Sequence, residues 1–142
     1  TNFMGTMPEI AVLKYGNHGK LYVYALDGNV ELTQPAIIDR SIPEPPPLTA
    51  SASELKRGEQ LYMTVCVACH GGAAVSSGVL PDLRMMSQAR HDAFKQIVID
   101  GILAQTGMAS FADVVTPDEA EYIRQFVISR AIIDREAAME SM

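Results

Sequence analysis

The chain has 142 residues, a length that favours a single domain or one small domain with an appendage. Apolar residues make up 48% and charged residues 20%, so the chain can bury a core and is not broadly disordered. Seventeen acidic and eleven basic side chains give a net charge of −6, which excludes a uniformly basic nucleic-acid binder, and no apolar run is long enough to cross a bilayer.

Residues 1–41 are expected to form an extended segment with a β-hairpin. Two short runs rich in Val, Ile and Tyr, 10–15 and 21–26, flank the turn sequence Gly-Asn-His-Gly, and a turn at 27–29 precedes a short strand at 30–32. The second run is apolar on both faces, which is typical of a strand buried on both sides, and an isolated hairpin is only marginally stable. We therefore expect this segment to pack on a larger sheet that the chain does not supply.

Residues 42–49 form the predicted domain boundary. They hold half of the eight prolines of the chain. Such a stretch favours polyproline II and acts as a semi-rigid spacer. Beyond it, residues 50–142 show helical spacing of apolar side chains and predict a mainly α domain.

Three main helices are predicted in this domain, each from apolar spacing and from capping residues. Gly58 and Tyr62 share one face of the first helix, where a glycine allows close packing on the third helix through Tyr122 or Phe126. The helices run from Ser51 or Ser53 to about Ala68, from about Arg90 to Asp100 with Gly101 as the stop, and from Thr116, with Glu119 completing a capping box, to about 134–138.

The chemistry of the sequence lies in Cys66-Val67-Ala68-Cys69-His70, which holds both cysteines of the chain. The spacing C-x-x-C-H is the attachment signature of c-type haem. Two thiols one helical turn apart can each add to a vinyl group of the same porphyrin, and the adjoining histidine can then give an axial nitrogen to the iron. The sequence therefore predicts one covalent haem on Cys66 and Cys69, with His70 as an axial ligand.

Two other interpretations of the cysteine pair stay open at this point. A thioredoxin-like dithiol has the same C-x-x-C spacing, but it belongs at the start of a helix after a strand, whereas this pair ends a predicted helix. A zinc site needs two more ligands, and only His18 and His91 remain. Neither histidine has ligand spacing, and we expect both to be solvated.

Met108 is the predicted second axial ligand of the iron. It lies in the loop 107–111 between the second and third helices, flanked by small residues, where a thioether can reach an iron atom without steric conflict. Met85 and Met86 compete, because they are nearer to the haem motif, and methionine is also a common core filler. A haem enzyme or gas sensor with an open or His-ligated site would require that Met108 does not bind iron.

Residues 81–84 are predicted to support the haem. Pro81 has a carbonyl but no N–H, so it can accept the free ring N–H of His70 and fix the orientation of the ring. Leu83 is predicted to lie on the ring edge, and Arg84 to pair with a haem propionate, since its planar guanidinium suits a carboxylate. The alternatives are an ordinary turn for Pro81 and a solvated surface charge for Arg84.

Taken together, residues 50–142 resemble class I cytochromes c. More narrowly, Val79-Leu80-Pro81-Asp82-Leu83-Arg84 and Gly107-Met108-Ala109-Ser110-Phe111 are similar to the cytochrome domain of quinohaemoprotein alcohol dehydrogenases. Those enzymes join an eight-bladed propeller, which holds pyrroloquinoline quinone (PQQ) and Ca²⁺, to a C-terminal cytochrome c through a proline-rich linker. Residues 19–28 are similar to the closing strand region of that propeller.

The resemblance implies that this haem takes electrons from PQQ and passes them to an external acceptor, such as a soluble cytochrome, a cupredoxin or a quinone. The PQQ and Ca²⁺ ligands belong to the propeller body, so none is assigned to this chain, which by itself carries electron transfer only. The resemblance also implies an exported, periplasmic bacterial protein. The alternative is a freestanding soluble cytochrome c or cytochrome subunit, which fits the haem residues equally well but leaves the hairpin and linker without a purpose.

Overall fold

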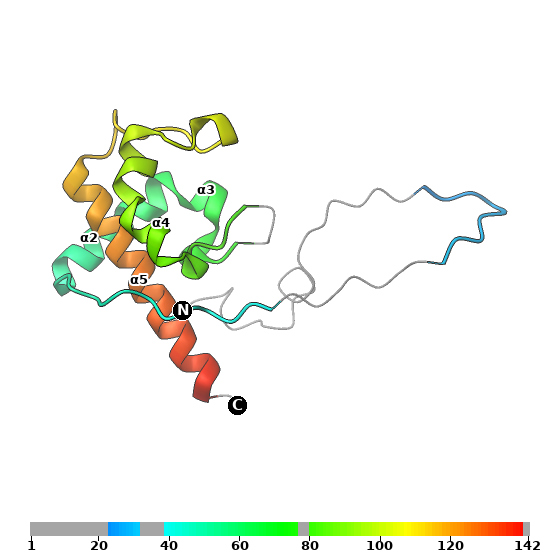
Figure 1. Cartoon of the computed structure of the whole chain (residues 1–142), viewed down its shortest axis with the longest axis horizontal. Coiled ribbons are helices and arrows are strands. Elements are labelled where there is room, and N and C mark those ends of the chain that lie inside the picture. The colour runs from blue at the N-terminus through cyan, green and yellow to red at the C-terminus, as the bar shows by residue number, and fades with distance from the viewer. Residues whose placement is uncertain (1–22, 32–38, 77–79, 141–142) are drawn as a thin grey trace.

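A computed structural model describes residues 23–31, 39–76 and 80–140 of the chain. Within these ranges the protein is helical and has no strand (Figure 1). None of the helices in this part of the chain is long and apolar enough to cross a membrane. In chain order the elements are α2 (Ala52–Val65), α3 (Val67–His70), η1 (Gly72–Ala74), η2 (Leu83–Met85), α4 (Gln88–Asp92), the π-helix η3 (Gln96–Asp100), η4 (Ala104–Thr106) and α5 (Pro117–Glu140).

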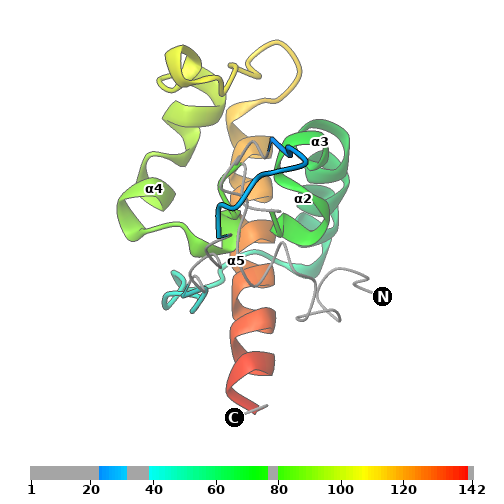
Figure 2. The same cartoon turned by 90° about the vertical axis from the view of Figure 1, so that its right-hand side faces the viewer.

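The long helix α5 is the axis of the domain. In Figure 2 α2 and α3 lie on one side of it and α4 on the other. The predicted capping box is confirmed, because Glu119 N–H donates to Thr116 Oγ1 (3.2 Å) and Thr116 N–H donates to Glu119 Oε2 (3.1 Å). The helix continues to Glu140, past the predicted end at 134–138, since its last turns contain good helix formers and no glycine or proline.

Helix α2 begins at Ala52, and Ser51 rather than Ser53 is its N-cap, in a capping box with Glu54. Gly58 faces α5 so closely that a Cβ built on it would lie 2.6 Å from the backbone carbonyl carbon of Tyr122. One turn later, the rings of Tyr62 and Phe126 meet with centroids 5.1 Å apart. The predicted close packing of the first and third helices is therefore confirmed, and it fixes the position of the turn that follows α2.

The predicted second helix is not continuous. A turn at Ala93 separates α4 from the helical residues that lead into η3, and Gly101 ends η3 in the left-handed conformation, as predicted (φ 67°). Phe94, Val98 and Ile102 follow α-helical spacing in the sequence, and Phe94 and Val98 are buried, but Ile102 is 57% exposed. A π-helix inserts one extra residue per turn, so side chains beyond it leave the face expected from α-helical spacing.

The predicted N-terminal hairpin lies largely outside the described residues. Its described part, 23–31, has a turn closed by a hydrogen bond from Gly28 N–H to Ala25 O (3.1 Å) and has no strand. The apolar side chains of Val23 and Leu26 are fully open to solvent there. A strand requires backbone partners on a neighbouring strand, and the predicted partner run 10–15 lies outside the described residues, so the hairpin stays a prediction.

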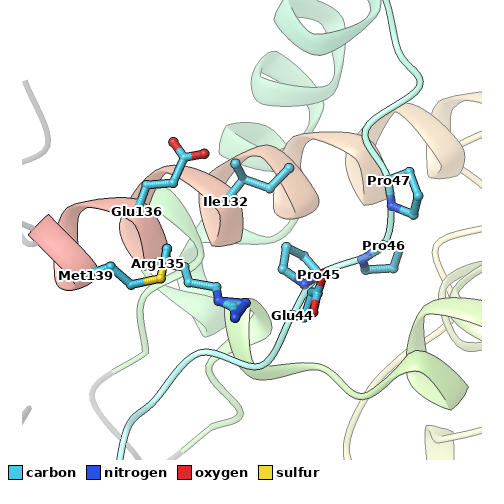
Figure 3. Close-up of a pocket in the computed structure, with 8 residues that line it drawn as sticks. All are labelled: Glu44, Pro45, Pro46, Pro47, Ile132, Arg135, Glu136 and Met139. Atoms are coloured by element: carbon cyan, nitrogen blue, oxygen red, sulfur yellow. The ribbon is translucent and has the colours of Figure 1, made fainter.

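The proline-rich segment packs on the domain. Thr49 and Ala50 donate their backbone N–H groups to the buried side-chain oxygen of Gln125 on α5 (3.0 and 3.3 Å). Further upstream the extended chain runs beside the last turns of α5 (Figure 3). The two together line a shallow surface pocket formed by Glu44, Pro45, Pro46, Pro47, Ile132, Arg135, Glu136 and Met139. The domain boundary at 42–49 stays a prediction.

Candidate haem site

The two cysteines lie in a single turn at the C-terminal end of α2 and in α3. Cys66 is the C-cap of α2 (φ −108°, ψ −30°), and α3 begins at the next residue. The backbone N–H groups of Cys69 and His70 both donate to the carbonyl of Cys66, at 3.2 and 2.9 Å. The two cysteines therefore lie about one helical turn apart, with Cys66 buried and Cys69 exposed. The placement matches the prediction that the pair ends a helix.

Burial makes the Cys66 thiol a weaker acid. It raises the pKa of this thiol to about 12, and the charge of a nearby Cys69 thiolate adds to the effect. A reactive dithiol needs the opposite, a lowered pKa that supplies the thiolate near neutral pH. Among the described residues no group of three or more His, Cys, Asp or Glu could hold a metal ion. Neither the dithiol nor the zinc interpretation gains support from this part of the chain.

His70 is oriented by the loop that follows the cysteine turn. Its side chain is buried, and its Nδ1 lies 3.1 Å from the carbonyl oxygen of Pro81. A carbonyl can only accept, so Nδ1 must carry the proton and donate. In the neutral ring this leaves the lone pair on Nε2, which can then bind a metal. The structure has the contact that was predicted for Pro81, while the axial role of His70 stays a prediction.

Tyr62 fixes the backbone immediately after His70. Its hydroxyl donates to the carbonyl of Gly71 at 2.7 Å, and the residue is fully buried. Burial raises the pKa of the Tyr62 phenol, so the hydroxyl stays protonated and remains a donor. Gly71 itself has φ 74°, a conformation that a side chain strains. The turn carrying His70 is therefore held from α2 as well as from Pro81.

Arg84 is not a solvated surface charge, because its side chain is largely buried and pairs with two carboxylates. Its Nε and Nη2 donate to the two carboxylate oxygens of Asp82 (3.0 and 2.7 Å), and its Nη1 donates to Asp134 of α5 (2.9 Å). Burial opposes the charge, but the two carboxylates outweigh it, so the pKa of Arg84 lies above its ordinary value. Pairing of Arg84 with a propionate stays a prediction, and any such pairing would share the guanidinium with two carboxylates of the chain.

Sequence reasoning missed three members of this charged group. Asp134 also accepts from Nη2 of Arg130 (2.7 Å), and Arg40, from before the proline-rich segment, lies 4.0 Å from Asp82. The only local signal was the i, i+4 spacing of Arg130 and Asp134 on α5. Nothing in the sequence connects that pair to Arg84, because the contact spans fifty positions.

Met108 lies on a loop anchored to η3. Its backbone N–H donates to Leu103 O (3.2 Å), the preceding Gly107 is left-handed (φ 98°), and Phe111 N–H donates to Val98 O (2.8 Å). The side chain of Met108 is partly buried and packs on the hydrophobic core. Met86 packs on the same core, so the geometry keeps both methionines available, and the choice of Met108 stays a prediction.

Three of the proposed haem residues lie in or against one apolar cluster. Cys66 belongs to its buried part, and Leu83 and Met108 pack against it as partly buried side chains. The donor set is a neutral imidazole nitrogen, a thioether and two thiols on one turn, which is the set that haem iron and porphyrin vinyl groups take. The residues present therefore fit a covalently bound haem. The whole cluster consists of Leu61, Tyr62, Cys66, Ala74, Phe94, Val98, Val115, Ala120, Ile123, Phe126 and Val127, with Val65, Val67, Leu83, Met86, Ile99, Met108 and Phe111 at its border.

One histidine expectation was wrong. His91 is buried (3% exposed), not solvated, and the charges of Arg124 and Glu121 on α5 act on its ring. Its Nδ1 has no hydrogen-bond partner, and burial lowers its pKa. It does not join the cluster described above. His18 lies outside the described residues.

The domain from α2 into α5 matches a known family. Residues 53–127 fit the family described as "Cytochrome C oxidase, cbb3-type, subunit III". This range contains the cysteine turn, the Pro81 loop and the Met108 loop, and it is more than half of the chain.

Larger redox proteins carry regions similar to this chain. It is 41% identical to the quinohemoprotein alcohol dehydrogenase ADH IIB of Pseudomonas putida, over 83% of this chain and 17% of that protein. It is 40% identical to the dehydrogenase subunit of the alcohol dehydrogenase (quinone) of Acetobacter aceti, over 81% of this chain and 16% of that protein. The solved structure of the quinohemoprotein alcohol dehydrogenase ADHIIG from Pseudomonas putida HK5 aligns with a TM-score of 0.67 at 39% identity, over 78% of this chain and 16% of that one. The chain thus spans about a sixth of the length of the relatives it matches.

Proposed function

The chain belongs to this cytochrome c family and matches the C-terminal cytochrome c region of quinohaemoprotein alcohol dehydrogenases, and on that premise we propose that it transfers single electrons from the PQQ of a dehydrogenase to an external acceptor. Electron transfer through a haem is what the cytochrome c family implies. The source and the destination of the electrons are the parts that we propose. The observation that carries the proposal is the Cys66–His70 turn with the His70 ring locked on Pro81.

A bound haem c supplies a one-electron couple between ferric and ferrous iron. In our proposal Cys66 and Cys69 anchor the ring, and His70 presents Nε2 to the metal because Nδ1 is committed to Pro81. Met108 provides a neutral sulfur ligand, which together with histidine raises the reduction potential and suits an acceptor of electrons. Leu83 and the rest of the apolar cluster exclude water from the ring.

The proposed donor is a PQQ- and Ca²⁺-containing propeller of the same protein. Support comes from the names of the relatives, which are quinohaemoprotein and quinone-linked alcohol dehydrogenases, and from the fact that the chain spans only about a sixth of their length. A short tether between donor and haem keeps their effective concentration high. We propose a periplasmic location on the same basis, and a soluble cytochrome, a cupredoxin or a quinone as the external acceptor.

The first test asks whether the haem is covalent. The chain is produced in a bacterium with a cytochrome c maturation system, beside the variants Cys66→Ser and Cys69→Ser, and denaturing gels are stained for haem. We expect a stained wild-type band that is weak or lost in each variant, and a spectrum of the wild type typical of two thioether bonds. A wild-type chain that yields no stained band would refute the haem site itself.

The second test concerns the sixth ligand. Met108→Ala and its matched control Met86→Ala remove the same thioether from two loops that border the same core. We expect the Met108 variant to lose the sulfur-to-iron charge-transfer band of the ferric protein and its ferrous form to bind carbon monoxide, while the control behaves as wild type. Reversed behaviour of the two variants would assign the ligand to Met86.

The third test identifies the donor. An extract of the native source is separated on a denaturing gel, stained for haem and probed with an antibody against this chain. A doubly positive band several times larger than 142 residues, whose native protein reduces its haem when alcohols are added in the presence of PQQ and Ca²⁺, is the expected result. A doubly positive band of the size of this chain alone would instead favour a separate carrier or subunit.

A further inference from the structure

The acceptor of the His70 hydrogen bond is itself held by an ion-pair system. Pro81 is followed directly by Asp82, whose carboxylate caps η2 by accepting the backbone N–H of Arg84 (3.1 Å). The same carboxylate receives two parallel N–H groups from the Arg84 guanidinium (3.0 and 2.7 Å). Bidentate pairs of this kind are geometrically specific as well as strong. The turn 81–84 is thereby closed on itself.

The closed turn is joined to helix α5 by an ion pair of Arg84. Nη1 of Arg84 donates to Oδ2 of Asp134 on α5 (2.9 Å), and Oδ1 of Asp134 is held by Nη2 of Arg130 (2.7 Å). The side chains of Asp82, Arg84 and Asp134 are only 6%, 13% and 15% exposed. Charges this well shielded interact more strongly than surface pairs, and breaking one side leaves a buried charge unpaired.

We propose that Arg84 and Asp134 are positioning residues for the axial histidine, acting through Pro81 and not by contact with the haem. The inference rests on the proposed function in that His70 is taken as an iron ligand. Asp134 anchors Arg84 to α5, Arg84 clamps Asp82, and the clamped turn keeps the Pro81 carbonyl in line with His70 Nδ1. In this role Arg84 uses only the N–H groups that bind Asp82 and Asp134, and it needs no contact with the haem.

The proposal has a directional consequence for the haem. A hydrogen bond from the ring N–H makes the imidazole a more basic ligand, and a more basic ligand favours ferric iron. Loosening the Pro81 contact should therefore raise the reduction potential. Removal of the Arg84 charge would by itself act in the opposite sense, since a nearby cation disfavours the ferric state.

The test uses two variants, of which Arg84→Lys separates position from charge. Arg84→Lys keeps the charge but removes the planar fork that grips Asp82 and Asp134 together. Asp134→Asn keeps the shape but removes the anchor together with a negative charge, a loss that by itself also raises the potential, so proton exchange is the deciding readout for this variant. Arg57→Gln is the matched control, because the pair of Arg57 with Glu119 also joins a distant segment to α5 but lies between α2 and α5, not at the Pro81 turn.

The readouts are the exchange rate of the His70 Nδ1 proton, observed by NMR of the haem-loaded full chain, and the reduction potential. We expect both test variants to exchange this proton about tenfold faster than wild type, the factor that corresponds to about 1.4 kcal/mol, the scale of one hydrogen bond. Their potentials should rise. In Arg57→Gln neither quantity should change.

The outcomes decide between this proposal and its alternatives. Wild-type exchange rates in Arg84→Lys and Asp134→Asn overturn it, and so does equal acceleration in Arg57→Gln, which would indicate general loosening. A change of potential with normal exchange overturns it too, because that pattern indicates an electrostatic or propionate contact. If Arg84→Lys does not accumulate with haem, Asp134→Asn alone decides. A wild-type chain without covalent haem would refute the proposed function, whereas these variant results refute only the positioning role.

Discussion

A methyl group added at Gly58 should lower the stability of this domain, because Gly58 packs directly against α5. It sits in the middle of α2, and the Cβ of an alanine would lie 2.6 Å from the carbonyl carbon of Tyr122 and 3.2 Å from the Cβ of Phe126 on α5. Real Cβ contacts essentially never fall below 3.0 Å. The obstacle is backbone in the middle of a helix, which cannot rotate away, so the two helices must separate.

The magnitude follows from two opposing effects. Overpacking of a core interface costs about 1–3 kcal/mol, and a backbone obstacle places Gly58→Ala at the upper end, about 3 kcal/mol. Alanine is a better helix former than glycine by about 1 kcal/mol, which offsets part of this. The net loss of about 2 kcal/mol corresponds to a fall in Tm of about 10 °C for a domain of this size.

The assay is thermal unfolding of the haem-loaded chain followed by circular dichroism. Glu59→Ala is the control, because it puts the same side chain on the exposed face of the same helix, where we expect a change in Tm of less than about 3 °C. Because the strained interface also carries the ring contact of Tyr62 with Phe126, the haem spectrum should broaden in Gly58→Ala. An unchanged or higher Tm in Gly58→Ala would refute the packing argument.

Three further variants test other contacts. Tyr62→Phe removes the hydrogen bond to Gly71 O and leaves that carbonyl without its buried donor, so urea unfolding should show a loss of about 1–3 kcal/mol. Ser51→Ala removes the N-cap of α2, with an expected loss of about 1 kcal/mol in the same assay. His91→Leu tests the pH dependence. Burial lowers the pKa of His91 below its ordinary 6.5, so the unfolded chain binds the proton first, and stability is complete above 6.5 and declines as the pH falls below it. The variant should lose less stability than wild type between about pH 7 and about pH 5.

Each of these expectations has a contrary result. Wild-type stability of Tyr62→Phe would mean that water or another donor satisfies Gly71 O. A Ser51→Ala variant as stable as wild type would mean that Glu54 and the solvent cap α2 without it. Parallel pH profiles of His91→Leu and wild type would assign the acid sensitivity of the domain to other groups.

The local parts of the structure were predictable from local signals. The capping boxes at Ser51 and Thr116, the left-handed stop at Gly101 and the end of α2 at the cysteine pair depend on residues within one turn of each other. The contact of His70 with Pro81 spans eleven positions, but the chemistry of both partners made it predictable. His70 ends the C-x-x-C-H motif, and Pro81 has no backbone N–H, so its backbone can only accept a hydrogen bond.

Other features depend on contacts that no local pattern encodes. After the break at Ala93 and the π-helix, Ile102 is exposed, although it continues the apolar spacing of the buried Phe94 and Val98. His91 is a polar residue at a helix start, which predicts a solvated side chain, but this side chain is buried in the folded domain. The strand expected at 21–26 stays a prediction, because β-structure requires a partner strand and the predicted partner lies outside the described residues.

The sequence by itself determined the predicted chemistry, because covalent haem attachment needs two thiols and a histidine at one short spacing, and the five consecutive residues 66–70 have that spacing. Only the tertiary structure decided how those residues are supported. It brought Asp134 to Arg84 across fifty positions, buried His91, and left two methionines at the border of the core. The physical reason is that these ion pairs and this burial depend on which surfaces meet after the helices have assembled, and local spacing along the chain does not specify those partners.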